Sequence, residues 1–184
     1  MRPGLGPEVG WSYGAQRTRG TRRQGREAGG VHRVRRSLAV QEGFEWKPLI
    51  LVGLARTHLG LGDGETALKT AREAVNVTRR SQGKFAEFIV RLCVAHVLLS
   101  TRGLVARGEI ESALQTAAET MAEMGARGFE PDVLIERARL ARLLGDEGRY
   151  RGELSEAHRL LTEMGATWRA AELERELRLF SEKR

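Results

Sequence analysis

Three glycines, Gly83, Gly125 and Gly165, each end a stretch of about twenty residues with helical patterning, and they lie 42 and 40 positions apart. Around the last two, the residues Glu-Met-Gly-Ala at 123–126 recur at 163–166. Internal repeats of about this length are typical of stacked helix pairs, which form extended binding surfaces rather than enclosed catalytic pockets. The spacing therefore predicts an all-α chain built from helical repeats.

The segments that end at Gly125 and Gly165 also share one apolar helical stripe. Its members follow a 4-3-4-3 spacing, which places five side chains on one face of a helix. Such a stripe needs a neighbouring helix, so we expect these side chains, the methionines included, to lie in the core. The segment that ends at Gly83 keeps only Leu68 and Val75 of this set. The stripe consists of Ile110, Leu114, Ala117, Met121 and Met124 in one segment and of Tyr150, Leu154, Ala157, Leu161 and Met164 in the other.

Start and stop signals divide the chain after residue 45 into successive helices. Proline suits the first turn of a helix because its missing N–H would have no partner there, and Pro48 and Pro131 each begin an expected helix. Asp63 and Thr167 are expected helix caps. No stretch alternates with period two for long enough to predict a strand. The expected helices span 48–61, 63–83, 85–101, 109–124, 131–145, a segment ending at 165, and 168–181.

The fold class that these segments predict is an antiparallel helix-pair solenoid of about three helix pairs plus a terminal helix. It would occupy residues 45–184 and bury one continuous core. The most apolar helix, at 85–99, is interrupted by Glu87 and Arg91 and is expected to be the most enclosed. It holds the single cysteine, Cys93, which fits a reducing compartment because one cysteine forms no internal disulfide. No run reaches the roughly 18 apolar residues of a membrane span, so we expect a cytoplasmic protein without membrane contact.

The N-terminal tail, residues 1–44, differs in composition from the rest. Residues 1–36 hold nine Arg and two Glu, which equals the whole net charge of +7. A Gly/Arg-rich segment with few apolar residues cannot offset its ordering entropy, so we expect disorder. Three interpretations stay open: no dedicated role, an organellar targeting peptide, or a nucleic-acid-binding arm that contacts phosphates and stacks bases on Trp11 and Tyr13. The arm would use Arg17, Arg19, Arg22, Arg23 and Arg26.

A resemblance to tetratricopeptide repeats starts in the first expected helix pair. Leu51, Leu54 and Ala55, then Gly62-Asp63, Ala67, Ala71 and Ala74, follow the order of large and small residues in that family. His58 stands where the family often has an aromatic residue, and Arg79 replaces the usual closing proline. The copy is therefore a degenerate one.

A more particular pattern lies in the C-terminal half, at residues 130–131, 136–138, 143–147, 156–160 and 162–166. It resembles the tetratricopeptide-like C-terminal region of large bacterial regulatory ATPases fused to nucleotide cyclase or LuxR-type DNA-binding domains. The resemblance covers about residues 45–180 and implies an interaction region, because the chemistry of that family belongs to other domains. The chain has no G-x-x-x-x-G-K-[S/T] phosphate loop.

The function predicted from these observations is a non-enzymatic protein-binding or regulatory scaffold, either standing alone or as part of a larger signalling regulator. Its partner would be another protein, and nucleic-acid binding through the tail is the alternative. Self-association is also expected if the first helix exposes apolar surface. The residues concerned are Leu49, Leu51, Val52 and Leu54.

Catalytic, cofactor and metal sites are not expected. Cys93 and His96 lie three apart on one helix, and cysteine–histidine nucleophile pairs exist, but we expect both to sit in a buried apolar helix. His32, His58 and His158 are scattered and form no metal pattern. Charged residues four apart are expected to be solvated pairs worth a few tenths of a kcal/mol each. These pairs are Glu65 with Lys69, Lys69 with Glu73, and Glu174 with Arg178.

Overall fold

The computed structural model describes residues 46–81 and 83–182, and this part of the chain is entirely helical. The tail at 1–44, for which disorder, targeting or nucleic-acid binding are the open interpretations, lies outside the described residues. Short 3₁₀ turns, η1 at Gly103–Ala106 and η2 at Arg127–Phe129, precede two of the helices. The α-helices are α2 (Lys47–Gly60), α3 (Gly64–Ser81), α4 (Lys84–Thr101), α5 (Arg107–Glu123), α6 (Glu130–Leu143), α7 (Glu147–Glu163) and α8 (Thr167–Glu182).

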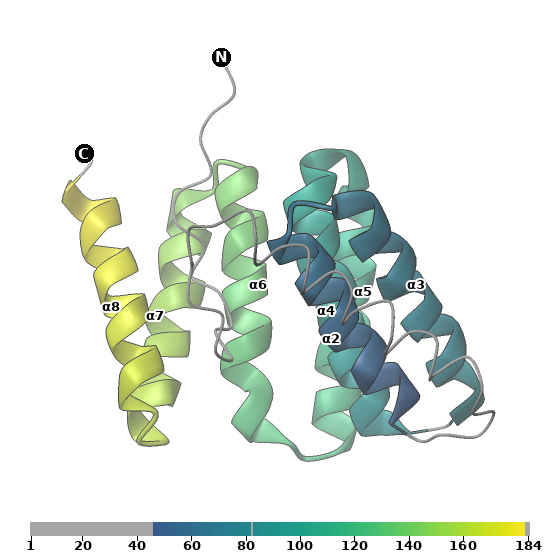
Figure 1. Ribbon diagram of the computed structural model, residues 1–184. Coiled ribbons are helices and arrows are strands. Elements are labelled where there is room, and N and C mark those ends of the chain that lie inside the picture. Colours follow the sequence, from purple (N-terminus) through teal and green to yellow (C-terminus); the bar gives the residue numbers. More distant parts are fainter. Residues whose placement is uncertain (1–45, 82, 183–184) are drawn as a thin grey trace, which may run out of the picture.

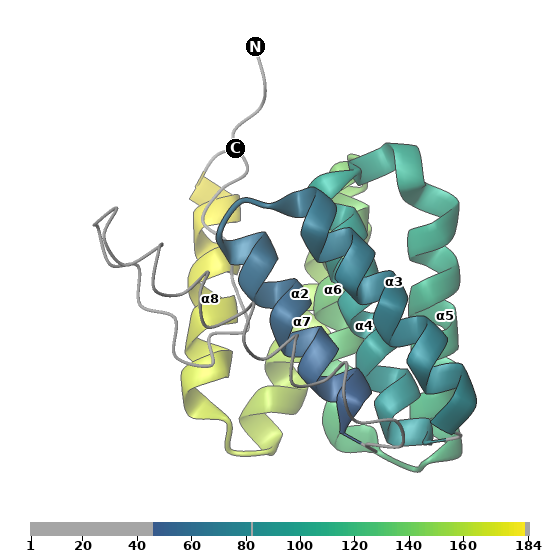
Figure 2. The same cartoon turned by 45° about the vertical axis from the view of Figure 1, so that its right-hand side comes forward.

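The helices form antiparallel pairs that follow one another in a row (Figure 1). The pairs are α2 with α3, α4 with α5, and α6 with α7, while α8 packs on α7 at the end of the row. Helix α4 contacts both helices of the first pair, and α6 meets α4 and α5 less extensively than it meets α7. Figure 2 shows the same row from a second side. The all-helical fold class is confirmed.

Helix boundaries lie within a few residues of the expected ones. Pro48 and Pro131 are in the first turns of α2 and α6, and the carboxylate of Asp63 accepts a hydrogen bond from the Thr66 N–H at 3.0 Å. Thr167 is the first residue of α8 rather than its cap. Asp146 instead is a cap that was not expected, because its side chain accepts from the Arg149 N–H at the start of α7.

The repeated glycines have two different roles. Gly125 and Gly165 follow α5 and α7 with φ of 62° and 72°, a left-handed conformation that glycine adopts without a steric penalty. Gly83 has φ of −80° and precedes the first residue of α4, so it begins a helix instead of closing one in the same way. The repeat of helix-ending glycines is therefore confirmed at the last two positions only.

The apolar stripes of α5 and α7 face the core, with one exception. Ile110, Ala117, Ala157 and Leu161 are fully buried. Met164 is half exposed, and its methyl lies 3.9 Å from where a side chain on Gly128 would begin, at the edge of η2. The prediction of a core position for Met164 was wrong, because α7 packs mainly against α6 and α8, whereas α5, which carries the corresponding Met124, has α4, α6 and both 3₁₀ turns around it.

Helix α4 contacts α2, α3, α5 and α6, which agrees with the expectation of a helix enclosed by its neighbours. Nine of its residues are buried, and only Phe85 among its large apolar side chains is substantially exposed. The rings of Phe85 and Phe88 lie 5.6 and 5.3 Å from the ring of Phe129, centroid to centroid. Because Phe129 belongs to η2, these contacts anchor the start of α6 on α4.

Helix α2 does not offer the apolar surface on which self-association was predicted. Leu51, Val52 and Leu54 are 1%, 4% and 7% exposed, because α2 turns them toward α3 and α4. The exposure on which that prediction depends is therefore not met at these three residues. The one strongly exposed large apolar residue described at this end is Trp46, before the first turn.

Surface ion pairs agree only in part with the expected spacing. Arg178 pairs with Glu174 along α8. Glu65 pairs at 2.8 Å with Arg102, which lies at the end of α4, rather than with Lys69. An ion pair between two helices therefore replaces the predicted pair within one helix. Either kind contributes little to stability when both side chains are this exposed.

The buried apolar residues form two clusters instead of one continuous core. The larger one spans α2 to α5 and includes Val133 and Leu140 of α6. The smaller one joins α7 and α8 to the opposite side of α6, at Ile135, Ala138 and Ala141. Helix α6 is therefore the element shared by both clusters, and it also carries the acidic side chains described next.

Candidate functional site

Two acidic side chains on α6 are buried one helical turn apart. Asp132 and Glu136 are each 1% exposed. A buried carboxylate is costly unless a positive charge or several hydrogen-bond donors face it. The sequence places both residues near the positive N-terminal end of this helix. A carboxylate there interacts favourably with the helix dipole even when it is solvated, so the sequence does not predict burial. The basic residues that face these two carboxylates must therefore offset the cost of burying them.

Glu136 is held by one residue of its own helix and one of α4. Its Oε1 accepts a hydrogen bond from Arg139 Nη1 at 2.7 Å and lies 3.1 Å from Nδ1 of His96. Burial by itself would raise the pKa of Glu136, but the charge of Arg139 and the ring of His96 outweigh it and lower the pKa to about 2. Glu136 is therefore ionised at neutral pH.

His96 Nδ1 meets both charged neighbours, and the two contacts need different tautomers. Arg139 Nη1 lies 2.6 Å from this nitrogen and can donate to it only if the proton of the ring is on Nε2. A proton on Nδ1 would donate to Glu136 instead. The His96 side chain is 17% exposed, so solvent reaches part of it.

One carboxylate oxygen of Glu136 lacks a hydrogen-bond donor among the described residues. Oε2 of Glu136 is buried without a hydrogen-bond partner among the described residues. A charged atom left in this state weakens a buried polar network as a whole. Glu136 is therefore held in place through Oε1 alone.

Asp132 links α6 to α8 through an ion pair with Arg169 Nη2. Burial raises the pKa of Asp132 to about 6, and the negative charge of Glu136 adds to this, while Arg169 and Arg56 act in the opposite direction. Asp132 is thus mostly ionised at pH 7 and takes up a proton in mildly acidic solution.

Cys93 is buried close enough to Arg56 and Glu136 for both charges to act on its thiol. Burial raises the pKa of its thiol to about 11, although Arg56 of α2 acts to lower it. A buried thiol that keeps its proton is not an activated nucleophile, because the thiolate is the reactive form. His96 makes its polar contacts with Glu136 and Arg139, across to α6. The arrangement does not favour a cysteine–histidine nucleophile.

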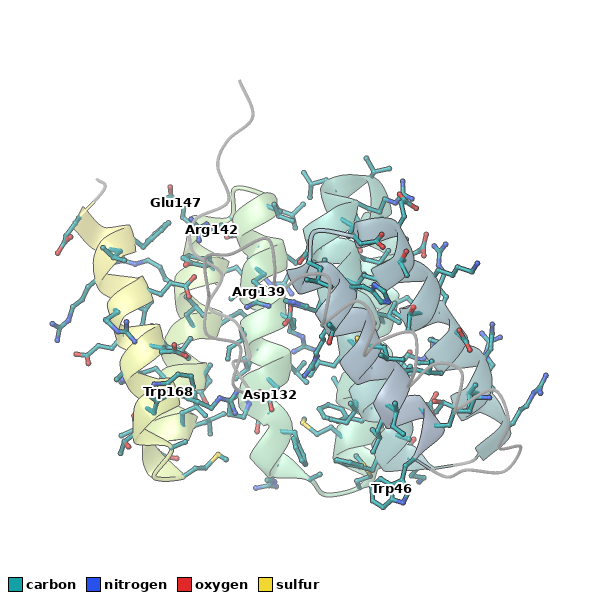
Figure 3. All side chains as sticks on the ribbon, viewed as in Figure 1. Trp46, Asp132, Arg139, Arg142, Glu147 and Trp168 are labelled. Carbon is teal, nitrogen blue, oxygen red and sulfur yellow. The ribbon has the colours of Figure 1, made fainter. Side chains whose placement is uncertain are left out.

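These side chains come from the first helix of every pair and from α8. Arg56 is on α2, His96 on α4, Arg139 on α6 and Arg169 on α8. Asp132 and Arg139 lie seven positions apart, about two turns of α6. Figure 3 shows both on this helix, between the first two pairs and α8. We call the six residues Arg56, His96, Asp132, Glu136, Arg139 and Arg169 the α6 polar cluster.

A second polar contact lies between α7 and α8. The hydroxyl of Tyr150 donates to Glu176 Oε1 at 2.7 Å, and the guanidinium of Arg142 lies 5.6 Å from the Tyr150 ring centre. Burial raises the pKa of Tyr150, and Glu176 raises it further. The ring of Phe180 packs 4.9 Å from that of Tyr150. This group fastens α8 to α7 and needs no ligand to be complete.

The remaining histidines of the described chain do not join the α6 polar cluster. His58 Nδ1 lies 3.8 Å from Asp63 Oδ2 at the turn after α2. Within residues 46–81 and 83–182, no group of three or more His, Cys, Asp or Glu is placed to hold a metal ion. His32 lies outside the described residues.

Sequence reasoning did not predict the α6 polar cluster. The available signal was the pattern of α6 itself, where Asp132, Glu136 and Arg139 fall on one side of the helix at spacings of four and three. On its own this pattern equally describes a solvated face. The partners His96 and Arg169 lie 40 and 37 positions away, and no local rule connects them.

Comparison with known proteins adds no relative. No protein-family model, curated protein or solved structure gives a significant match to the chain. None of the helices described is both long enough and apolar enough to cross a membrane.

Proposed function

We propose that the chain is a tetratricopeptide-like solenoid with a non-enzymatic, scaffolding role, and that the face formed by α2, α4, α6 and α8 binds an acidic segment of another protein. The solenoid architecture is supported by Gly62, Gly103 and Gly145, which stand between the helices of the three pairs at intervals of 41 and 42 residues. Fully buried alanines such as Ala71 and Ala138 permit close approach of the helices.

The observation that carries this proposal is the sign of the charge in the α6 polar cluster. Three arginines face two carboxylates, so the cluster keeps a positive excess even when His96 is neutral. The Arg139 and Arg169 side chains are 22% and 33% exposed, so part of each side chain can be reached from solvent. Guanidinium groups bind carboxylates with two parallel hydrogen bonds in favourable geometry. An acidic segment is the partner that this chemistry fits.

The test is affinity capture from native lysate with the full chain as bait, followed by mass spectrometry. Arg56→Gln and Arg169→Gln should each reduce the yield of a stoichiometric protein partner. The matched control is Arg107→Gln on α5, an exposed arginine in a surface ion pair with Glu111. Circular dichroism shows whether each variant keeps its helix content. Equal yields from all four baits would contradict binding at the cluster.

The alternative is nucleic-acid binding through the arginines of the tail, which the composition of residues 1–36 favours. Binding of this kind weakens steeply as salt is raised. Deleting residues 1–44 should abolish it while leaving capture of a protein partner by the helical part unchanged. The two functions are therefore separable in one set of baits.

A further inference from the structure

The outer face of α8 carries two large apolar side chains that nothing described covers. Trp168 is 55% exposed and Leu179 is 53% exposed. They lie eleven positions apart, which is three helical turns, so both point in the same direction. Leu173 and Leu177, which lie on the opposite side of the helix, pack toward α7. Figure 3 shows Trp168 on α8, at the end of the row that lies away from α2.

Between these two residues the same face carries one acidic and one basic side chain. Glu172 and Arg175 follow Trp168 at intervals of four and three, and Leu179 follows Arg175 after four more. Arg175 is 69% exposed, and its guanidinium comes only within 4.0 Å of Glu172 along the helix. By contrast, Arg178 and Glu174 on the flank of this face are in direct contact. The ion pair between Arg175 and Glu172 is therefore long, although Arg175 Nε also donates to the Ala171 carbonyl at 3.3 Å and the Glu172 side chain is only 24% exposed.

The 4-3-4 spacing of these four residues reads the same in both directions along the helix. Trp168 and Leu179 are symmetric about the midpoint that also separates Glu172 from Arg175. Two copies of α8 packed antiparallel about a twofold axis would therefore place each Trp168 against Leu179 of the other copy. In the same arrangement each Glu172 would face Arg175 of the other copy. Both the apolar and the charged residues would meet complementary residues.

We propose that α8 is a self-association surface, and that two copies of the chain pair through Trp168, Glu172, Arg175 and Leu179 in an antiparallel, twofold contact. The central residues carry one charge of each sign, so the face offers no net charge to attract the basic tail. Its spacing and its charges are instead complementary to those of a second copy. The contact is a single pair of helices of 16 residues, so the dimer falls among weak and transient interfaces.

The experiment is sedimentation of the full chain over a wide range of concentration. The wild-type chain should move from one to two copies of its 20.5 kDa mass as concentration rises. Arg175→Glu places two glutamates opposite two others and should weaken the dimer by about tenfold or more, and Glu172→Arg should do the same with arginines. The matched control is Val105→Glu, at the most exposed large apolar residue described, which should leave association unchanged.

Mixing the two charge variants tests the antiparallel geometry itself. In a mixed dimer, the arginine introduced at position 172 of one chain would face the glutamate introduced at position 175 of the other. The unchanged Arg175 of the first chain would face the unchanged Glu172 of the second, so both contacts would be complementary. We expect Glu172→Arg and Arg175→Glu chains to associate with each other while neither associates with itself. A wild-type chain that remains monomeric at every concentration, or a dimer equally stable in Arg175→Glu, would overturn the proposal.

Discussion

Nδ1 of His96 on α4 lies 3.1 Å from Oε1 of the buried Glu136 on α6, and this contact crosses the junction between the two apolar clusters. Only a few apolar residues of α6, Val133 and Leu140 among them, join the larger cluster. The polar contact therefore supplies a specific link where hydrophobic burial is limited. It fixes α6 against α4 at one defined position along both helices.

Replacing Glu136 with glutamine should destabilise the fold by about 2 kcal/mol, because Arg139 and His96 lose the charged acceptor between them. The measurement is urea unfolding at neutral pH. The control is Glu156→Gln, which removes a carboxylate paired with Arg159 on the exposed side of α7. Loss of that surface pair should leave the unfolding midpoint almost unchanged, because solvent screens it. Equal effects of the two substitutions would show that Glu136 does not stabilise the junction.

Stability should rise as the pH is lowered from about 6 toward 4, because of Asp132. Its pKa is about 6 in the folded chain against 3.8 in an unfolded one, so the folded chain binds the proton more tightly in this window. The expected gain is on the order of 3 kcal/mol. Glu136 acts with the opposite sign, since its pKa is lowered from 4.5 to about 2, and its contribution is lost only below pH 4.5.

Urea unfolding at a series of pH values measures this dependence. Asp132→Asn should flatten the profile between about pH 4 and 6, since asparagine does not titrate. A wild-type profile without a rise in that window, or one that Asp132→Asn leaves unchanged, would contradict the role of Asp132.

The sequence predicted the helices well because their signals are local. Pro48 and Pro131 mark helix starts, Asp63 caps a helix through its own side chain, and Gly125 ends one through its own backbone. Each signal depends on residues within about four positions. The apolar stripe of α5 is also local, because helical periodicity alone brings its members to one face.

The polar cluster and the exposed stripe of α8 depend on which helices lie next to each other. Asp132 is buried because Arg169 reaches it from α8, 37 positions away. Met164 is exposed although its counterpart Met124 packs against the core, so identical sequence around two residues did not give them identical surroundings. The order and tilt of the helix pairs decide such cases, and the repeat pattern does not encode them.

Cys93 should resist thiol reagents in the folded chain. It is fully buried, and burial raises the pKa of its thiol to about 11, so the reactive thiolate is scarce and inaccessible. The measurement is the rate of labelling with an aromatic disulfide at neutral pH. In denaturant the single thiol should react completely, which serves as the control. Rapid labelling of the folded chain would contradict this environment and would reopen a nucleophilic role.

Two glycines should respond in opposite directions to replacement by alanine. Gly145 follows α6 with φ of 74°, which strains any residue with a side chain, so Gly145→Ala should destabilise the fold by about 1 kcal/mol. Gly53 lies inside α2 with nothing within 4 Å of an added methyl group. Gly53→Ala should therefore stabilise by roughly 0.5–1 kcal/mol, through the lower entropy of the unfolded chain and the higher helix propensity of alanine. Thermal unfolding followed by circular dichroism measures both. A shift of the thermal unfolding midpoint in the same direction for both substitutions would contradict this assignment of the difference to backbone conformation.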